Sequence, residues 1–369
     1  MNMKLENDFA ELLKQKLDEA LEKRGKVNIV VAGKTGVGKS TLVNAVFQGN
    51  LAETGDGRPV TKTTREIKKD GLPISIFDTR GLEVSEYRNT VQELEELMQN
   101  KRKSEDPNQH IHIAWVCVLE GSRRVEDAEV KLVEMLDKYV PVVGVITKSV
   151  SDNGFRQTAQ ELLPQARNVV RVLAKETVFD DGYTIPIMGL DNLVELTMDL
   201  VPETQRDALA AAQKVSVNQK RKRAHAVVGT AALSAGGAGA VPLPFSDALA
   251  IIPVQISMLA SISAVWGLPV STTFLGTLVS GAITGSAGTF AGRAAVGALL
   301  KLIPGIGSTA GGAISAGVAS TLTIAFGEAY ITALYALTKD DSNRIPTAEE
   351  IRDEFMRQLK SRKKEPATG

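Results

Sequence analysis

Residues 33–40 decide the fold, and they read Gly33-Lys34-Thr35-Gly36-Val37-Gly38-Lys39-Ser40. The stretch has the pattern GxxxxGK(S/T), with an apolar run at 27–31 before it and a helical pattern at 40–47 after it. In this context the glycines let backbone N–H groups face phosphate oxygens at the N-terminus of a helix. The sequence therefore predicts a nucleoside triphosphate site, made by these residues together with Thr41.

Magnesium is the cofactor that this site implies. We expect Lys39 to reach the β and γ phosphates and Ser40 to offer its hydroxyl to Mg²⁺. Asp78 ends the apolar run 74–77, where a carboxylate can hold the metal through water. Gly81 completes the pattern DxxG and can bring a backbone N–H to the γ phosphate. The predicted metal ligands are Ser40, Asp78 and one threonine.

Three threonines compete for that last role: Thr61, Thr63 and Thr64. If Asp70 and Gly71 make a two-residue hairpin turn, Thr63 faces Asp78, which places Thr63 and Thr64 within a strand ladder. Thr61 lies just before the ladder, in a segment free to close over the metal, and we prefer it. Thr64 is the alternative, and a third interpretation has none of the three on the metal.

The segment around these motifs predicts an α/β fold. From about residue 26, short apolar runs alternate with polar helical stretches, which is typical of a mostly parallel sheet covered by helices in three layers. The expected strands are 27–32, 64–69, 72–77, 111–118, 141–147 and 184–188. The expected helices lie near 39–48, 86–102, 125–138, 154–175 and 191–200.

At 369 residues the chain is long enough for more than one domain. We expect an amphipathic N-terminal helix at 1–25, a phosphate-binding domain at 26–202, a linker helix with an apolar all-helical domain at 203–340, and a charged C-terminal helix and tail at 341–369. The linker helix is expected to be polar and to continue from about 203 to the basic cluster at 220–223.

The third segment is depleted in charge. Between residues 224 and 338 the charged side chains are Asp247, Arg293, Lys301 and Glu328, while Gly, Ala, Ser and Val dominate. Stretches such as 248–292 exceed the length needed to cross a bilayer, which favours membrane contact. The alternative is a helical domain whose small residues let its helices pack tightly against one another.

Charge and cysteine content limit which partners and which cellular compartment the sequence indicates. Basic and acidic residues number 43 each, so no global field implies nucleic acid as a partner. Cys117 is the single cysteine, and its apolar run, 111–118, predicts a buried thiol and a reducing environment. The charged N-terminal stretch lacks the apolar core of a signal peptide. We expect a cytoplasmic protein at the inner face of the cell membrane.

The elements at 33–40, 61–64 and 78–81, in this order, resemble the small GTPase domain of the bacterial Era and TrmE-like class over about residues 26–200. The resemblance implies GTP and GDP as ligands. That class reads the base with Asn-or-Thr-Lys-x-Asp, matched here by Thr147, Lys148, Ser149 and Val150. Valine stands where the class places the aspartate that accepts two hydrogen bonds from guanine, and Asp152 is a candidate substitute. In place of a Ser-Ala pair, a backbone contact from Gly189 or Leu190 would complete the base site, and the alternative is a plain strand end there.

The catalytic group of this GTPase-like site is not identified by the sequence. Leu82 stands where Ras-like proteins place a glutamine, and Era-type proteins also carry an apolar residue there. The charged candidates in the flexible loops are Lys34, Arg58, Arg65 and Arg80. A second molecule in a nucleotide-dependent homodimer is the alternative source.

The segment 205–338 resembles a Gly/Ala-rich, YcjF-like domain of unknown function that follows bacterial GTPases and is associated with inner membranes. The resemblance rests on 242–247, 252–255 and 302–307. The leading hypothesis is a Mg²⁺-dependent GTPase whose switch controls this helical domain. The alternatives are a nucleotide-regulated scaffold with negligible turnover and, because of Val150, an ATPase.

Overall fold

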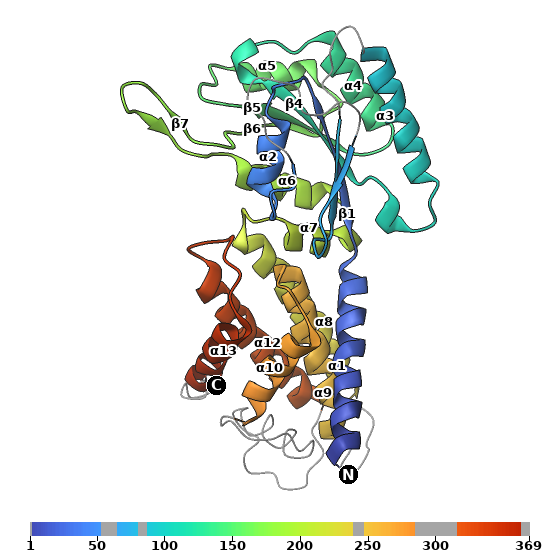
Figure 1. Ribbon diagram of the computed structural model, residues 1–369, viewed down its shortest axis with the longest axis vertical. Coiled ribbons are helices and arrows are strands. Elements are labelled where there is room, and N and C mark those ends of the chain that lie inside the picture. Colours follow the sequence, from blue (N-terminus) through green and yellow to red (C-terminus); the bar gives the residue numbers. More distant parts are fainter. Residues whose placement is uncertain (1, 53–64, 80–86, 239–246, 285–315, 363–369) are drawn as a thin grey trace. The chain divides into compact units, whose positions relative to one another are not determined.

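The computed structural model describes residues 2–52, 65–79, 87–238, 247–284 and 316–362 (Figure 1). The chain divides into two compact units. One is Gly25–Ser216, which carries the phosphate-binding motif, and the other combines Met1–Arg24 with Val217–Gly369. By compactness, residues 203–216 group with the first unit, and the N-terminal and C-terminal helices group with the apolar segment.

The first unit is built on a six-stranded sheet in the order β2-β3-β1-β4-β5-β6. Its strands are β1 (Val27–Gly33), β2 (Arg65–Lys68), β3 (Ile74–Asp78), β4 (Ile113–Leu119), β5 (Val142–Thr147) and β6 (Asn168–Arg171). Neighbours run parallel except β2, which is antiparallel to β3. A separate hairpin pairs β7 (Thr177–Val178) with β8 (Thr184–Ile185).

Helices cover both faces of this sheet, as the apolar runs of the central strands predict. The helices are α2 (Lys39–Val46), α3 (Tyr87–Arg102), α4 (Asp127–Asp137), α5 (Phe155–Leu162), α6 (Leu190–Leu200) and α7 (Arg206–Ala212). On one face Val30 and Val116 pack with Leu94, Leu132 and Phe155 of α3, α4 and α5. On the other, Trp115 stacks on Phe47 and donates to Thr197 Oγ1 of α6 at 3.1 Å. The three-layer α/β prediction is confirmed.

The expected helix at 154–175 is wrong in its second half. Helix α5 ends at Leu162, and Leu163 adopts φ −119° because the following Pro164 disfavours a helical conformation before it. The β-branched pair Val169 and Val170 then forms β6, which is the sixth strand of the sheet. The expected strand 184–188 instead contributes β8 to the separate hairpin.

The register of the β2–β3 hairpin also differs from the prediction. Leu72 N donates to Lys69 O at 3.1 Å, as the expected turn requires, but the ladder pairs Lys68 with Ser75 and Arg65 with Asp78. Pro73 has no N–H for this ladder, and its carbonyl accepts from Val27 of β1 instead. Arg65, rather than Thr63, therefore faces Asp78.

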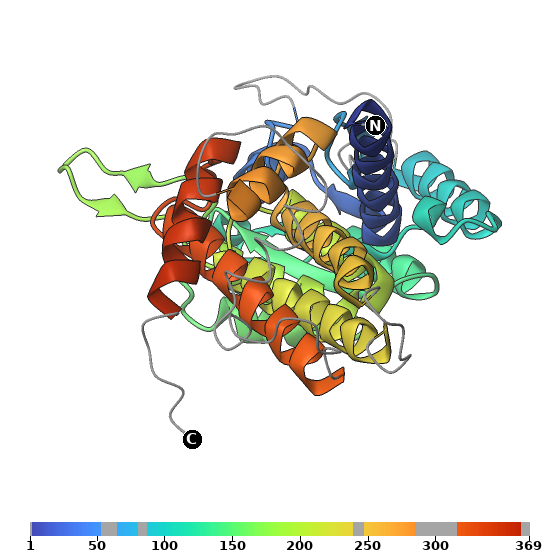
Figure 2. The ribbon, with the colours of Figure 1, turned by 90° about the horizontal axis from the view of Figure 1, so that it is seen from below.

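The second unit is a helical bundle, seen from below in Figure 2. Its helices are α1 (Asn2–Arg24), α8 (Val217–Ala238), α9 (Asp247–Trp266), α10 (Thr272–Thr284), α12 (Ala316–Thr338) and α13 (Ala348–Arg362). Helix α8 packs on α9 and α12, α1 on α9, and α13 on α10 and α12. Leu13 and Leu17 of α1 share a core with Tyr330 of α12 and Phe355 of α13.

Small residues bring these helices close together. A Cβ at Gly327 of α12 would lie 2.5 Å from Val228 Cγ2 of α8 and 2.9 Å from Met258 Sδ of α9. One buried hydrogen bond joins α9 to α12, where Gln255 Nε2 donates to Thr323 Oγ1 at 3.0 Å. Among the described helices, none combines the length and apolar character needed to span a membrane.

The expected polar helix from 203 to 223 is interrupted between α7 and α8. Gln213 Oε1 accepts from the backbone N–H groups of Val215 and Ser216 at 2.7 Å each, and its Nε2 donates to Ser216 O at 2.8 Å. Gln213 also pairs with Phe47 in an isolated bridge. This buried glutamine ends the helical path and holds α7 in the first unit.

Candidate nucleotide-binding site

The loop between β1 and α2 has the backbone shape that its glycines allow. Gly33, Gly36 and Gly38 adopt φ values of 143°, 73° and 103°, a region that disfavours other residues. A Cβ on Gly33 would lie 2.5 Å from Cys117 O, whereas a Cβ on Gly36 would meet no atom of the described residues within 4 Å. The loop is therefore fixed at its start by β4 and open at its centre, where a ligand can approach the backbone.

Lys39 places a cation within this loop. It begins α2 and is 8% exposed, and its Nζ donates to Gly33 O at 2.9 Å and to Lys34 O at 3.1 Å. Ser40 and Thr41 follow in the first turn of α2. The ammonium and the N-terminal end of the helix both favour an anion at the same place.

Asp78 lies beside the loop at the carboxyl end of β3. It is 4% exposed and pairs with Val31 of β1 in the parallel register. Cys117 of β4 pairs with Gly33 of β1 and is close enough to Asp78 and Lys39 to be affected by their charges. Burial raises the pKa of its thiol to about 12, and the Asp78 carboxylate adds to this while the Lys39 ammonium opposes it. The thiol is thus a neutral core group, as its apolar run predicted.

The donors at this edge fit Mg²⁺. The Ser40 hydroxyl and the Asp78 carboxylate are hard oxygen ligands of the kind this ion prefers. Within the described parts of the chain, no group of three or more His, Cys, Asp or Glu side chains could hold a metal. Thr61, Thr64 and Gly81 lie outside the described residues.

Two of the charged catalytic candidates can be placed. Lys34 Nζ forms an ion pair with Glu126 Oε1, from the segment just before α4. Arg65 lies opposite Asp78 in the β2–β3 ladder. Arg58 and Arg80 lie outside the described residues.

The end of β5 is bonded to the phosphate-binding loop. Thr147 Oγ1 donates to Val37 O at 2.7 Å and to Val118 O at 3.1 Å. Lys148 is exposed, adopts φ 51°, and its Cε lies 3.7 Å from the position of a Cβ on Gly38. The Lys148 stem therefore runs along the loop, where it can cover a nucleoside.

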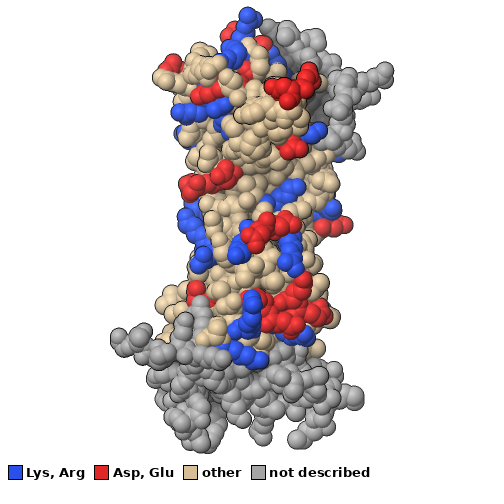
Figure 3. All heavy atoms as spheres, turned by 90° about the vertical axis from the view of Figure 1, so that its left-hand side faces the viewer, with Lys and Arg blue, Asp and Glu red and all other residues tan. Residues whose placement is uncertain are grey.

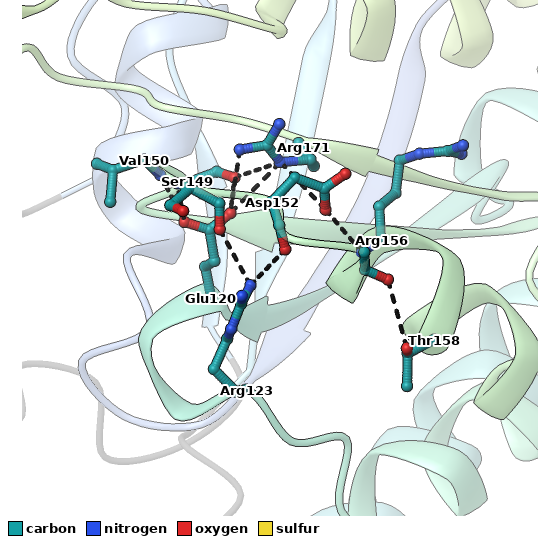
Figure 4. A network of polar contacts seen from close by, with 10 residues as sticks. Glu120, Arg123, Ser149, Val150, Asp152, Arg156, Thr158 and Arg171 are labelled. Atoms are coloured by element: carbon teal, nitrogen blue, oxygen red, sulfur yellow. Dashed lines mark hydrogen bonds and ion pairs between the residues drawn. The ribbon is translucent and has the colours of Figure 1, made fainter.

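Glu120, which the sequence analysis missed, organises the loop after β5 (Figure 4). It follows β4 and is 3% exposed. Its Oε1 accepts from Ser149 Oγ, and its Oε2 accepts from Val150 N at 2.5 Å and Ser151 N at 2.8 Å. A single carboxylate directly after an apolar strand was the available signal, because ligand-site residues gather at carboxyl ends of parallel strands.

Arg171, at the end of β6, closes this network. Its Nε donates to Ser149 Oγ at 2.9 Å, and its Nη2 lies 3.3 Å from Glu120 Oε1. Burial of Glu120 opposes its ionisation, but the hydrogen bonds from the 149–151 loop and the Arg171 charge outweigh this and lower the pKa of the carboxyl. Glu120 is therefore held as a carboxylate.

Asp152, the candidate substitute for the missing aspartate, bonds the first turn of α5. Its Oδ1 accepts from Arg156 N at 2.9 Å in the first turn of α5 and lies 3.7 Å from Arg171 Nε. Arg123 Nη1 donates to its backbone carbonyl at 2.5 Å. The structure thus places this carboxylate at the start of a helix (Figure 4).

Gly189 and Leu190 lie at the same edge of the sheet. Gly189 has φ 74°, and a Cβ there would lie 1.9 Å from Arg171 O, so only glycine fits. Leu190 begins α6 and is 8% exposed. The structure therefore brings 188–190, the 147–151 loop and the phosphate-binding loop together at the carboxyl edge of one sheet.

A strand, glycine loop and helix with a buried lysine, beside a strand-terminal aspartate, define a P-loop nucleotide-binding domain. Residues 28–148 match the family model of the 50S ribosome-binding GTPases, and residues 204–361 match a domain of unknown function, DUF697. The chain is thus a P-loop GTPase domain joined to a DUF697 domain, and both predicted resemblances are confirmed.

Individual relatives match parts of the chain. The tRNA modification GTPase MnmE of Cupriavidus pinatubonensis is 30% identical over 151 residues, 39% of this chain and 31% of that protein. The ribosome biogenesis GTPase A of Bacillus licheniformis is 39% identical over 75 residues, 20% and 26% of the two chains. A crystal structure of Aquifex aeolicus Era bound to GDP and AlF4⁻ has a TM-score of 0.34 at 17% identity, covering 57% of this chain and 68% of that one. The chain spans less than half the length of these curated relatives.

Proposed function

We propose that this protein binds GTP with Mg²⁺, hydrolyses the β–γ phosphoanhydride, and uses the nucleotide state to control its helical unit. The observation that carries the proposal is the position of Lys39, whose ammonium is held inside the glycine loop at the start of α2. A buried cation among loop carbonyls is suited to a polyphosphate that enters the same loop.

Each described residue at the site has a role in this proposal. The N–H groups of residues 34–38 and the Lys39 ammonium bind the phosphates, while Ser40 and Asp78 hold Mg²⁺. The ion, when bound, neutralises charge between the β and γ phosphates. Lys148 and the backbone at Gly189 flank the base.

The catalytic group must come from outside the residues already given a role. Lys34 is already paired with Glu126, which weakens it as a free cation near the γ phosphate. We therefore propose that a second molecule completes the site in a nucleotide-dependent homodimer. Sedimentation of the protein with GDP and with a non-hydrolysable GTP analogue tests this; a monomer in both states would contradict it.

Turnover is tested by phosphate release from GTP and from ATP with Mg²⁺, with and without liposomes. We expect release from GTP, and we expect Lys39→Ala to abolish it because the phosphate-binding cation is lost. Lys138→Ala, an exposed lysine after α4, is the matched control. GTP binding without turnover under any condition would favour the nucleotide-regulated scaffold, and a preference for ATP would favour the ATPase.

We further propose that the helical unit contacts the inner face of the cell membrane. The low charge of residues 224–338 supports this. The close packing around Gly327 supports the alternative, a helical domain packed on itself. Carbonate extraction of membranes from cells that make the protein tests the proposal: we expect it in the membrane pellet, and its release when 224–338 are deleted. A protein found wholly in the supernatant would contradict membrane contact.

A further inference from the structure

The base of a bound nucleotide can lie on only one side of the phosphate-binding loop. The phosphates occupy the loop after β1. On one side of this loop lies β3, whose Asp78 is the proposed Mg²⁺ ligand. On the other side, Thr147 bonds the end of β5 to the phosphate-binding loop, and the Lys148 stem lies beside Gly38. Because ligands of such sheets lie along the carboxyl ends of the strands, the nucleoside extends toward β5 and β6.

The loop at that place presents an apolar side chain. Val150 is 42% exposed, and its backbone N–H donates to Glu120. Ser149, beside it, is fully buried and bonded to the same carboxylate. The part of the loop that can face a base edge is therefore the Val150 side chain, which has no hydrogen-bond acceptor.

Among the described residues, Glu120 bonds this loop and Asp152 follows it in the chain, and both carboxylates have protein partners. Glu120 uses Oε1 for Ser149 and Arg171 and Oε2 for the N–H groups of Val150 and Ser151. Asp152 directs Oδ1 to the first turn of α5 and to Arg171. Turning Glu120 toward a ligand would leave buried donors unpaired, which is costly.

We propose that this site binds a purine nucleotide without a carboxylate acceptor for the N1–H and 2-amino group of guanine, and that it therefore accepts GTP and ITP with similar affinity. The two nucleotides differ only by the 2-amino group, which ITP lacks. This inference rests on the proposed nucleotide binding, and it deepens that proposal by setting the class of base that the site accepts.

The ratio of the GTP and ITP affinities shows whether a carboxylate binds the 2-amino group. A hydrogen bond to a charged acceptor changes affinity by about tenfold or more. A site with a carboxylate for the 2-amino group should therefore prefer GTP over ITP by at least that factor. Without the carboxylate, we expect the two dissociation constants to agree within about threefold, which is the scale of a weak solvent-exposed contact.

The experiment is competition against a fluorescent GTP analogue on the full chain with Mg²⁺, using GTP and ITP as competitors. Equal displacement supports the inference, and a preference for GTP of tenfold or more overturns it. If neither nucleotide displaces the probe and the probe itself does not bind, the proposed nucleotide binding fails instead.

Variants test which residue sets the selectivity. Val150→Asp should raise the preference for GTP over ITP to about tenfold or more, since it supplies the missing acceptor. Val178→Asp, an exposed valine on the β7–β8 hairpin, adds the same charge elsewhere and should leave the ratio unchanged. Asp152→Asn should also leave it unchanged; a loss of GTP affinity without a loss of ITP affinity would identify Asp152 as the acceptor and overturn the inference. The wild-type ratio decides the matter even if Val150→Asp fails to fold.

Discussion

At the scale of single residues, the site depends on side chains that hold loops in place. Glu120 contacts three successive residues of the 149–151 loop through its two oxygens and is anchored by Arg171. Its conformation is therefore coupled to the shape of the loop beside the proposed base. Lys39 acts in the same way on the phosphate side, where it is bonded to two carbonyls of its own loop.

Glu120→Gln should lower the free energy of unfolding of the first unit by about 1–3 kcal/mol, because an amide cannot accept from all the buried donors that the carboxylate satisfies. Urea unfolding followed by Trp115 fluorescence in a Trp266→Phe background measures this. Glu134→Gln, an exposed residue on α4, is the control, with an expected change within about 0.5 kcal/mol. Equal effects of the two variants would contradict the role given to Glu120.

The same carboxylate should show a defined pH dependence. Its pKa is lowered in the folded protein, so the stability it contributes is complete above the unfolded carboxyl pKa of about 4.3 and is lost as pH falls through the lower folded value. The stability difference between wild type and Glu120→Gln should therefore be constant near neutral pH and shrink below about pH 4. A difference that grows as pH falls would have the wrong sign.

At the scale of elements, close approach of helices is set by glycine. Helix α12 reaches α8 and α9 at Gly327, where an added Cβ would lie 2.5 Å from Val228. Glycine costs helix stability in an exposed position, but here it allows the contact. Gly229 on α8 has the opposite surroundings, because a Cβ there would meet no atom within 4 Å in the part of the chain that the structure describes.

Gly327→Ala should destabilise the helical unit by about 1–3 kcal/mol, because α12 must shift away from α8 to admit the methyl group. Gly229→Ala should instead stabilise it by up to about 1 kcal/mol through helix propensity alone. Thermal unfolding monitored by circular dichroism separates the two. A stabilising effect of both substitutions would show that α12 does not approach α8 this closely.

At the scale of the whole molecule, the chain forms two units with separate cores, and the second is assembled from both ends of the sequence. Leu13 of α1 belongs to the same core as Leu334 of α12, while Leu132 of α4 belongs to the first unit. Charged side chains of both signs are interspersed over the described residues of the face in Figure 3, in keeping with the balanced composition.

Calorimetry should therefore resolve two transitions. Leu13→Ala and Leu334→Ala should lower the same one, and Leu132→Ala the other, because each removes about 2–5 kcal/mol of core packing from its own unit. Leu233→Ala, 80% exposed on α8, should move neither. If Leu13→Ala lowered the transition that Leu132→Ala lowers, α1 would have been assigned to the wrong unit.

The sequence alone determined the phosphate-binding loop, the strand-terminal Asp78, the three-layer fold and the buried Cys117. These features are local: a glycine pattern between a strand and a helix, and apolar runs of fixed length, depend on neighbours along the chain. The helix expected at 154–175 was wrong after Leu162, where β6 forms instead, because one proline and two valines outweigh a helical pattern only when a sheet edge is available to pair with.

Tertiary structure decided what depends on residues far apart in the sequence. Glu120 and Ser149 are brought together only by the pairing of β4 with β5, and α1 joins the helices after Ser216 only because their apolar faces meet. The β2–β3 register differs from the predicted one, and Pro73 O accepts from Val27 N of β1, a contact that no hairpin pattern contains. Long-range pairing of this kind carries no periodic signal in the sequence, which is why the base side of the site became visible only in the folded chain.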